Sequence, residues 1–278
     1  MSHDRYEGRS VERSDTASRS QLRALAATLD CAIPGGEELP PLWHWMLFQD
    51  WAAGRDLGAD GHPSRGGFLP EDPAYPRRMW AGGRLSFERA VCIGRDARRQ
   101  SRVLHATEKQ GSTGRALWVS VEHVLTDERG TLLTEQQDLV YRAAASASSS
   151  PPPPPAPQAA PGVVREARAI DAVLLFRYSA LTGNAHRIHY DLDYARNQEG
   201  YEGLVVQGAL QATLLADFAQ RQSPAKALRE FAFRARWPAL LHRCPMTLEA
   251  WPLTGTWQLR SLDSHGVVCM SAEARFEP

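Results

Sequence analysis

The chain of 278 residues is long enough for one large domain or two of ordinary size, and its 43% hydrophobic and 23% charged residues exclude disorder throughout. Its 32 basic residues balance 32 acidic ones, so it lacks the summed positive field that holds a nucleic-acid backbone. No apolar run approaches the roughly 20 residues of a membrane helix, and the first twenty residues lack the apolar segment of a secretory signal. We therefore expect a cytoplasmic protein without nucleic-acid or membrane partners.

The first half predicts two helices followed by strands. Residues 22–30 have the apolar spacing of a short amphipathic helix, and residues 40–52, PPLWHWMLFQDWA, predict a mostly apolar helix that opens with prolines. A loop rich in glycine and proline covers residues 54–76. Strand-like segments follow, and in one of them Trp118 and Ser120 alternate with apolar residues as in a half-buried strand. These segments are GRLSFERAV (83–91), SRVLHATEK (101–109), ALWVSVEHVL (116–125) and LLTEQQDLVYR (132–142).

A change of composition divides the chain. Residues 143–162 read AAASASSSPPPPPAPQAAPG, which offers nothing to bury and has a stiff polyproline stretch at its centre. We interpret this segment as an extended linker between a first domain, residues 1–142, and a second domain, residues 163–278. A proline-rich ligand for a partner domain is the alternative.

The second half repeats the order of helix and then strands. Residues 205–221 predict a helix in which Leu210, Leu214 and Phe218 form one apolar stripe. Because each half combines a buried helix with an antiparallel meander, we predict an α+β protein in which a helix packs on a sheet twice. The strand-like segments here are FAFRARW (231–237) and VVCMSAEARF (267–276).

Residues of types that often take part in catalysis lie between the linker and the second-half helix. His186 and His189 stand three apart beside Asn184, after a glycine that permits a tight turn. The spacing alone fits a metal pair on a helix, but the HExxH order and a nearby third ligand are missing, so we predict no metal. Exposed loop histidines without a role are the other interpretation. The following VVQGAL places Gly208 at a helix start, where free backbone N–H groups can hold an anionic oxygen.

The run from Tyr178 to His189, YSALTGNAHRIH, resembles the hydratase motif of MaoC-like enoyl-thioester hydratases, which reads roughly Y-S-x-[ST]-G-D-x-N-P-[IV]-H. The variant HRIHYD, followed by valines and QG, is similar to one subgroup. It holds the mitochondrial 3-hydroxyacyl-thioester dehydratases and the bacterial mesaconyl-C4-CoA and itaconyl-CoA hydratases. The first half resembles the bacterial branch, so the resemblance covers nearly the whole chain except the linker. The segments that carry it are LPPLWHWMLFQDW, DGHPSRGGFLP, PRRMWAGGRLSF, TEKQGSTGR and TEQQDLVYR.

The resemblance implies a double hot-dog fold, two helix-wrapped antiparallel sheets in tandem. We expect the sheet edges between the halves to pair, because an unpaired edge is a liability. The resemblance also implies a hydro-lyase whose partner is an acyl-CoA, with no cofactor beyond the coenzyme A of the substrate. In such proteins one half keeps the catalytic residues, and the first half here has no counterpart of NAHRIH. The first half is therefore expected to be non-catalytic, with a widened groove for the acyl chain or part of the coenzyme.

Two positions depart from the motif. Asn184 stands where the wider family has the Asp of its catalytic pair, and His186-Arg187 stands where it has Asn-Pro. An asparagine cannot take a proton at neutral pH, so the two-residue scheme cannot be transferred whole. His189 matches the catalytic histidine of the family directly.

Hydration of an enoyl thioester takes a proton from water as the water attacks Cβ, delivers a proton to Cα and gathers charge on the thioester oxygen. His189 can give and take these protons, since an ordinary histidine pKa is about 6.5. We expect Asn184 to orient the water through its side-chain oxygen, and the N–H of Gly208 to hold the enolate oxygen. His186 is a second proton carrier, a residue that orients His189, or a hydrogen-bonded loop residue.

Arginines near the motif suggest the acyl group. Arg187 stands beside the histidines and can pair with a substrate carboxylate, and Arg77, Arg78 or Arg65 can do so from the first half. Such a pair suits a dicarboxylic acyl group, so we predict hydration of mesaconyl-C4-CoA or itaconyl-CoA to citramalyl-CoA. A solvated surface position is the alternative for each arginine.

Two other functions stay open at this point. One is a 3-hydroxyacyl-thioester dehydratase of fatty-acid metabolism, and the other is a protein that binds acyl thioesters without turnover. A second copy of the chain, in a homo-oligomer, is a further expected partner.

Overall fold

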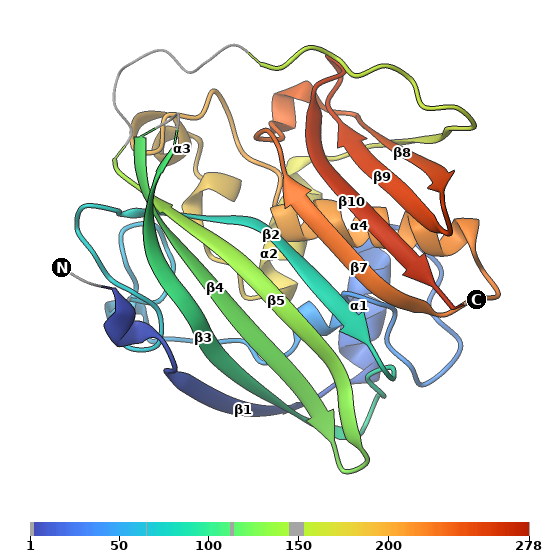
Figure 1. Ribbon diagram of the computed structural model, residues 1–278, viewed down its shortest axis with the longest axis horizontal. Helices are drawn as coiled ribbons and strands as arrows, with labels where there is room; N and C mark the ends of the chain where they lie inside the picture. The colour runs from blue at the N-terminus through green and yellow to red at the C-terminus, as the bar shows by residue number, and fades with distance from the viewer. Residues whose placement is uncertain (1–2, 65, 112–113, 145–152, 278) are drawn as a thin grey trace.

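One antiparallel sheet of ten strands runs through both halves of the chain (Figure 1). The computed structural model describes residues 3–64, 66–111, 114–144 and 153–277. The strand order is β1-β3-β4-β5-β2-β7-β10-β9-β8-β6, so both halves have the same order when each is followed inward from its outer edge. The strands of the first half are β1 (Ser10–Thr16), β2 (Arg77–Phe87), β3 (Asp96–Gly111), β4 (Gly114–Asp127) and β5 (Gly130–Arg142). Those of the second half are β6 (Val164–Arg168), β7 (Leu228–Ala235), β8 (Met246–Leu253), β9 (Thr256–Leu262) and β10 (Val268–Phe276).

The two halves join where β2 pairs with β7. Leu85 lies opposite Phe231, and Gly83 lies opposite Phe233. A Cβ at Gly82 would lie 2.5 Å from the carbonyl oxygen of Phe233, so glycine is what allows the two strands to approach here. The pairing confirms the continuous sheet that the sequence predicted.

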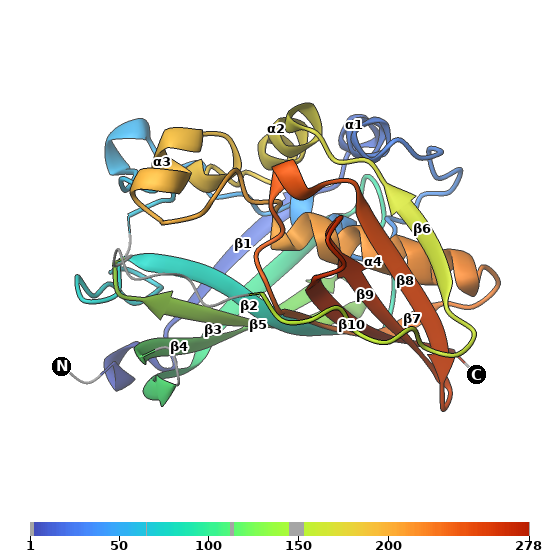
Figure 2. The ribbon, with the colours of Figure 1, turned by 90° about the horizontal axis from the view of Figure 1, so that it is seen from above.

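Helices cover one face of this sheet, as Figure 2 shows from above. Helix α4 (Gly208–Gln222) packs against β7, β8, β9 and β10, and the predicted stripe of Leu210, Leu214 and Phe218 is buried. Ala212, Ala216, Ala219 and Leu215 are buried as well, so α4 lies in the core with most of its surface covered. The remaining helices are α1 (Arg19–Leu29), α2 (Ala172–Leu181) and α3 (Leu192–Asn197), and α1 packs beside α2.

The long helix predicted over residues 40–52 is wrong. Only a single 3₁₀ turn, η2 (Trp43–Met46), forms there. Leu42 and Phe48 flank it with φ angles of 69° and 59°, outside the right-handed helical region. The apolar residues from Leu42 to Phe48 are mostly buried, by a tight turn rather than by a helix, whereas Trp51 is 76% exposed.

A buried carboxylate explains the shape of this turn. Glu135 is 2% exposed, and it accepts hydrogen bonds from Trp45 Nε1 at 3.0 Å and His44 Nε2 at 3.3 Å. Both donors come from η2 and reach the same carboxylate, whose buried charge needs them.

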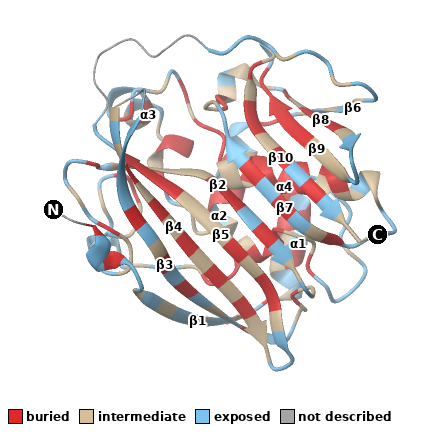
Figure 3. Ribbon diagram, viewed as in Figure 1, coloured by how far each residue is buried: buried red, intermediate tan, exposed pale blue. Residues whose placement is uncertain are grey.

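One hydrophobic core joins the two halves. Leu85 and Leu132 of the first half belong to the same cluster as Leu210 and Phe231 of the second. Figure 3 shows buried and less buried residues alternating along the strands, and in β4 this confirms the predicted period of two. The halves therefore share both a sheet and a core.

The described part of the proline-rich segment lacks regular secondary structure. Residues 153–160 form neither helix nor strand, and the carbonyl oxygen of Gln158 accepts a hydrogen bond from Arg260 Nη2 at 3.0 Å. Residues 145–152 of the predicted linker lie outside the described residues. All four cysteines are free thiols. Among the described residues, no helix combines the length and the apolar character of a membrane span.

Candidate active site

His189 ends the 3₁₀ turn η4 (Arg187–His189), which follows α2. Its Nδ1 lies 2.7 Å from the carbonyl oxygen of Val205. Because a carbonyl oxygen only accepts hydrogen bonds, Nδ1 carries the proton and Nε2 keeps its lone pair. Backbone geometry therefore makes Nε2 the proton-accepting atom of His189.

Burial sets the charge of His189. The residue is 6% exposed, and the loss of solvation lowers its pKa to about 3. The nearby His186 also lowers this pKa, while the hydrogen bond to Val205 opposes the shift. The imidazole is therefore neutral at neutral pH, as a general base must be.

His186 is held by a buried carboxylate. Its Nε2 donates to Oε1 of Glu199 at 2.8 Å, and Arg77 Nε donates to Oε2 of the same group at 3.3 Å. Glu199 is 3% exposed, and such a buried charge needs both donors. The rings of His186 and His189 meet edge to face, with centroids 5.7 Å apart. These contacts suit a residue that orients His189, one of the three expected roles of His186.

Asn184 shapes the turn before the histidines. Its backbone N–H donates to the carbonyl of Ser179 at 2.9 Å, and its Oδ1 accepts from the backbone N–H of His186 at 3.1 Å. Gly183 has a φ of 58°, and a Cβ there would lie 2.4 Å from Oε1 of Gln49. The side chain of Asn184 thus holds the loop, and one lone pair of its oxygen remains for a water.

Gly208 begins α4, three residues after the carbonyl that holds His189. The helix has no side-chain cap at Gln207, and the first N–H groups of a helix lack partners within it. A Cβ at Gly208 would meet only Met270 Cε, at 3.9 Å, so packing does not require glycine there. The position fits the predicted role of an oxyanion donor.

A loop of the first half packs on the turn that carries the histidines. The backbone N–H of Arg187 donates to the carbonyl of Asp60 at 2.9 Å, and Arg187 Nη1 donates to the carbonyl of Ala59 at 3.1 Å. Gly61 has a φ of 89°, and a Cβ there would lie 2.1 Å from the carbonyl oxygen of Ala185. Figure 2 shows this light-blue loop beside α3 of the second half. The site is therefore built by both halves.

The same loop brings His62 to the site. The rings of His62 and His186 have centroids 4.5 Å apart. Asp60 Oδ2 lies 3.2 Å from His62 Nδ1, and Asp60 Oδ1 accepts from the backbone N–H of His62 at 3.0 Å. Burial and the charge of Arg78 lower the pKa of His62 to about 3, against the opposing effect of Asp60.

The sequence did not lead us to Asp60, His62 or Glu199. Asp60 and His62 belong to DGHPSRGGFLP, a segment whose sequence indicates the family resemblance but no role for either residue. The available signal was an Asp and a His two residues apart in a long loop, a kind of segment that often carries function. Periodicity and spacing have no means of linking that loop to His186, far away in sequence.

Arg187 does not have a free charge for a substrate. Its Nη2 and Nε lie 2.7 and 3.0 Å from Oδ2 of Asp191, and its guanidinium lies over the ring of Tyr194. This pairing counts against the prediction that Arg187 receives a substrate carboxylate, because Asp191 already meets its charge. Arg65, another candidate for that role, lies outside the described residues.

The other two candidate arginines differ in their partners. Arg77 is paired with Glu199 and lies over the ring of Tyr201. Arg78 is half-buried beside His62 and forms no hydrogen bond or ion pair with the described part of the chain. Arg78 is therefore the better placed of the two to meet an added carboxylate.

Three groups that are able to bind a metal meet at this site. Atoms of Asp60, His62 and His186 all lie within 4.8 Å of one another, which is not the HxxH pair considered from sequence. The surrounding charges weigh against a divalent cation, because Arg77 already pairs with Glu199 and the positive charge of Arg78 lies beside His62. A second such group, on the first half alone, consists of His3, Asp72 and Glu108.

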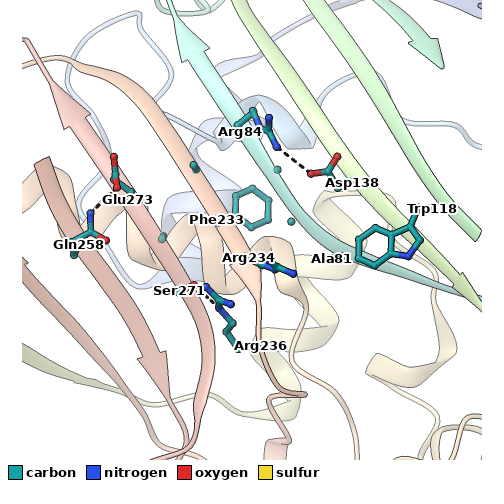
Figure 4. A pocket seen from close by; sticks show the side chains of 14 residues that line it. Ala81, Arg84, Trp118, Asp138, Phe233, Arg234, Arg236, Gln258, Ser271 and Glu273 are labelled. Atoms are coloured by element: carbon teal, nitrogen blue, oxygen red, sulfur yellow. Dashed lines mark hydrogen bonds and ion pairs between the residues drawn. The ribbon is translucent and has the colours of Figure 1, made fainter. Parts of the chain in front are cut away.

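A groove of about 470 Å³ follows the seam of the sheet on the face away from the helices (Figure 4). Polar side chains pair along its walls: Arg84 forms an ion pair with Asp138 at 3.6 Å, and Gln258 donates a hydrogen bond to Glu273 at 2.7 Å. None of the site histidines lines it, so the groove is separate from the candidate active site.

Comparisons with known proteins agree with this geometry. The sequence profile of the hydroxyacyl-thioester dehydratase type 2 family matches residues 42–241. A mesaconyl-C4-CoA hydratase from Chloroflexus aurantiacus is 40% identical over 268 residues, which cover 95% of this chain and 94% of that protein.

Solved structures agree on the fold. A MaoC-like dehydratase from Phytophthora capsici matches with a TM-score of 0.72 at 13% identity, over 97% of this chain and 96% of that one. A Mycobacterium tuberculosis protein described as a double hot-dog fold matches with a TM-score of 0.57 at 15% identity, over 98% and 96%. The predicted double hot-dog fold is confirmed, with η2 in place of the first central helix.

Gly61→Ala tests whether the first-half loop is docked on the histidine turn. The added Cβ meets the carbonyl of Ala185, whereas in Gly94→Ala, at a φ of 74°, a Cβ meets nothing within 4 Å. Both variants strain the backbone, so their difference isolates the contact. We expect Gly61→Ala to lower the free energy of unfolding by about 1–3 kcal/mol more than Gly94→Ala. Urea denaturation measures both, and equal losses would contradict the docking.

Proposed function

The chain belongs to the hydroxyacyl-thioester dehydratase type 2 family, and we propose that it is an acyl-CoA hydratase. It is a hydro-lyase that adds water reversibly across the α,β double bond of an enoyl-CoA. The observation that carries this function is the state of His189, a buried, neutral imidazole whose Nδ1–H is held by a backbone carbonyl. Its Nε2 is thereby free to take a proton from water.

The proposed reaction begins with this proton transfer. His189 Nε2 removes a proton as the water oxygen bonds to Cβ, and Asn184 orients the water through its remaining lone pair. Charge then moves to the thioester oxygen, where the N–H of Gly208 at the start of α4 stabilises it. Protonation of Cα completes the hydration, and the reverse sequence is the dehydration.

We propose mesaconyl-C4-CoA as the substrate that follows this sequence of steps. Itaconyl-CoA is a second proposed substrate; its double bond joins Cβ to a methylidene carbon, so it gives the same citramalyl-CoA when the proton goes to that carbon instead of Cα. The 40% identity to a mesaconyl-C4-CoA hydratase supports this acyl group. Both substrates carry a free carboxylate, which costs several kcal/mol to bury without a cation. Arg78, which has no ion pair among the described residues, is the proposed receptor for this carboxylate.

Two alternatives have weaker support. A fatty-acid 3-hydroxyacyl-thioester dehydratase would need a site for neutral chains, and the unpaired charge of Arg78 argues against one. A protein that only binds acyl thioesters would not need a buried base with a fixed tautomer. We further propose a cytoplasmic homo-oligomer that uses no cofactor beyond the coenzyme A of its substrate.

A small panel of enoyl-CoAs tests the function directly. Hydration of mesaconyl-C4-CoA, crotonyl-CoA or a medium-chain enoyl-CoA removes a double bond conjugated with the thioester, so the absorbance should fall on addition of the protein. The double bond of itaconyl-CoA is not conjugated with the thioester, so its conversion is followed by chromatography of citramalyl-CoA. We expect turnover of mesaconyl-C4-CoA and itaconyl-CoA to exceed that of crotonyl-CoA and of a medium-chain enoyl-CoA. A preference for the neutral chains would favour the fatty-acid dehydratase, and no turnover at all would favour the binding protein.

His189→Gln tests the general base. The amide of glutamine can still donate to the carbonyl of Val205, so we expect the fold to persist. Loss of one acid–base group should lower kcat about 10²–10⁴-fold. Turnover close to that of the wild type would remove His189 from the mechanism.

The pH dependence of the wild-type enzyme tests the state of the same residue. Protonation of His189 abolishes the base, and burial lowers its pKa to about 3. Activity should therefore not fall at the pH of about 6.5 where an exposed histidine titrates, but only at lower pH. The acid limb of kcat/KM, measured where circular dichroism shows the protein folded, gives the answer. A midpoint near 6.5 would contradict the buried, neutral base.

Arg78→Met tests the carboxylate receptor. Removing the guanidinium should lower kcat/KM for mesaconyl-C4-CoA about tenfold or more, because its carboxylate loses a charged partner. Turnover of crotonyl-CoA, which has no second carboxylate, should change little. Arg84→Met, which alters an arginine of the seam groove, is the control. Equal effects on both substrates would show that Arg78 does not recognise the carboxylate.

A further inference from the structure

Hydration needs proton transfer at two positions, Cβ and Cα. The hydratase motif that this chain resembles provides a titratable Asp and a His, whereas this chain provides only the His at the matching positions. Water loses a proton at Cβ and the substrate gains one at Cα. Asn184, which stands where the pattern has Asp, has an amide that does not exchange a proton at neutral pH. His189 has a single free nitrogen, because Nδ1 is held by Val205.

The first half brings another histidine to the same place. His62 lies against His186, with ring centroids 4.5 Å apart, and His186 in turn lies 5.7 Å from His189. His62 Nδ1 is 3.2 Å from Asp60 Oδ2, so the carboxylate receives the Nδ1 proton. The Nε2 of His62 makes no hydrogen bond with the described residues.

His62 and His189 differ in the group that holds the Nδ1 atom of each ring. Asp60 is a carboxylate, which offsets the charge of a protonated imidazole. Val205 offers only a neutral carbonyl, which fixes the tautomer but provides no countercharge. The proton donor of the pair is therefore better placed at His62, and the acceptor at His189.

We propose that His62, held by Asp60, is the second acid–base residue of the hydratase site, contributed by the half without the hydratase motif. The inference rests on the proposed function and assigns a donor to its last step. His62 donates from Nε2 to Cα after His189 has taken a proton from water.

The step balances in atoms and charge. One O–H bond of water breaks, its proton goes to His189 Nε2, and the C–O bond forms at Cβ. The π electrons move toward Cα and the thioester oxygen, and a C–H bond then forms at Cα with the proton of His62. Exchange with solvent deprotonates His189 and reprotonates His62, so a turnover takes up no net proton.

Three groups facing His62 control its protonation. Burial, Arg78 on β2 and His186 on the second-half turn together lower the pKa of His62 to about 3, and Asp60 opposes them. His62 is therefore neutral before substrate binds. A substrate carboxylate bound at Arg78 cancels one of the opposing charges. A dicarboxylic substrate therefore favours protonation of His62 when it binds, which a neutral enoyl-CoA does not.

His62→Gln tests this assignment through the pH profile of kcat. A donor that must be protonated gives the wild type an alkaline limb, at higher pH for mesaconyl-C4-CoA than for crotonyl-CoA. We expect His62→Gln to lower kcat about 10²-fold and to abolish that limb, while its acid limb, set by His189, persists. Asp60→Asn keeps the imidazole but removes its countercharge, so its alkaline limb should move to lower pH.

Controls separate this inference from the proposed function. His105→Gln changes a histidine of β3 that is 74% exposed, and it should leave the profile unchanged. Circular dichroism and urea denaturation establish that each variant is folded. A wild type that hydrates no enoyl-CoA overturns the proposed function itself. A wild type that is active while His62→Gln keeps its rate and its alkaline limb overturns only the role of His62. Activity lost with EDTA and restored by Zn²⁺ also overturns it, in favour of a metal at Asp60, His62 and His186.

Discussion

The packing of residues 58–62 on the turn that carries the histidines is the contact on which the site depends. It needs a glycine at position 61, because any Cβ there overlaps the carbonyl of Ala185. It is closed by the hydrogen bond from the backbone N–H of Arg187 to the carbonyl of Asp60. The sheet seam holds the halves together along β2 and β7, but this contact determines where His62 lies.

The charges around the histidines follow from that packing. Glu199 meets Arg77 and His186, while Asp60 meets His62, so each carboxylate in the site has a histidine as a partner. The one cation left without a described partner is Arg78. An arginine without an ion-pair partner is suited to a substrate with one extra carboxylate, and its positive charge disfavours a divalent metal beside it.

Short-range sequence patterns predicted most of the fold. For the site, they predicted only residues from Tyr178 to Gly208. The alternation in β4 and the stripe of α4 are short-range signals, and both were confirmed. The segment around Trp43 was predicted as a helix because its apolar content resembles one, and the donors that Glu135 requires override that preference. His62 was not found because its importance comes from a contact between distant segments, which neither period nor spacing encodes.

The two halves have the same order of elements, and the difference between η2 and α4 explains why one site forms rather than two. Helix α4 begins at Gly208 and offers free N–H groups beside His189. The turn at Trp43 has no helix start of this kind, and its side chains are used to satisfy Glu135. The described turn at Trp43 therefore does not repeat the proposed oxyanion site of α4. What it provides instead is the loop before β2, which carries Asp60 and His62, and β2 itself, which carries Arg78. Under the proposed mechanism the two halves therefore share one active site: the second half holds the thioester, and the first half supplies a proton and a countercharge.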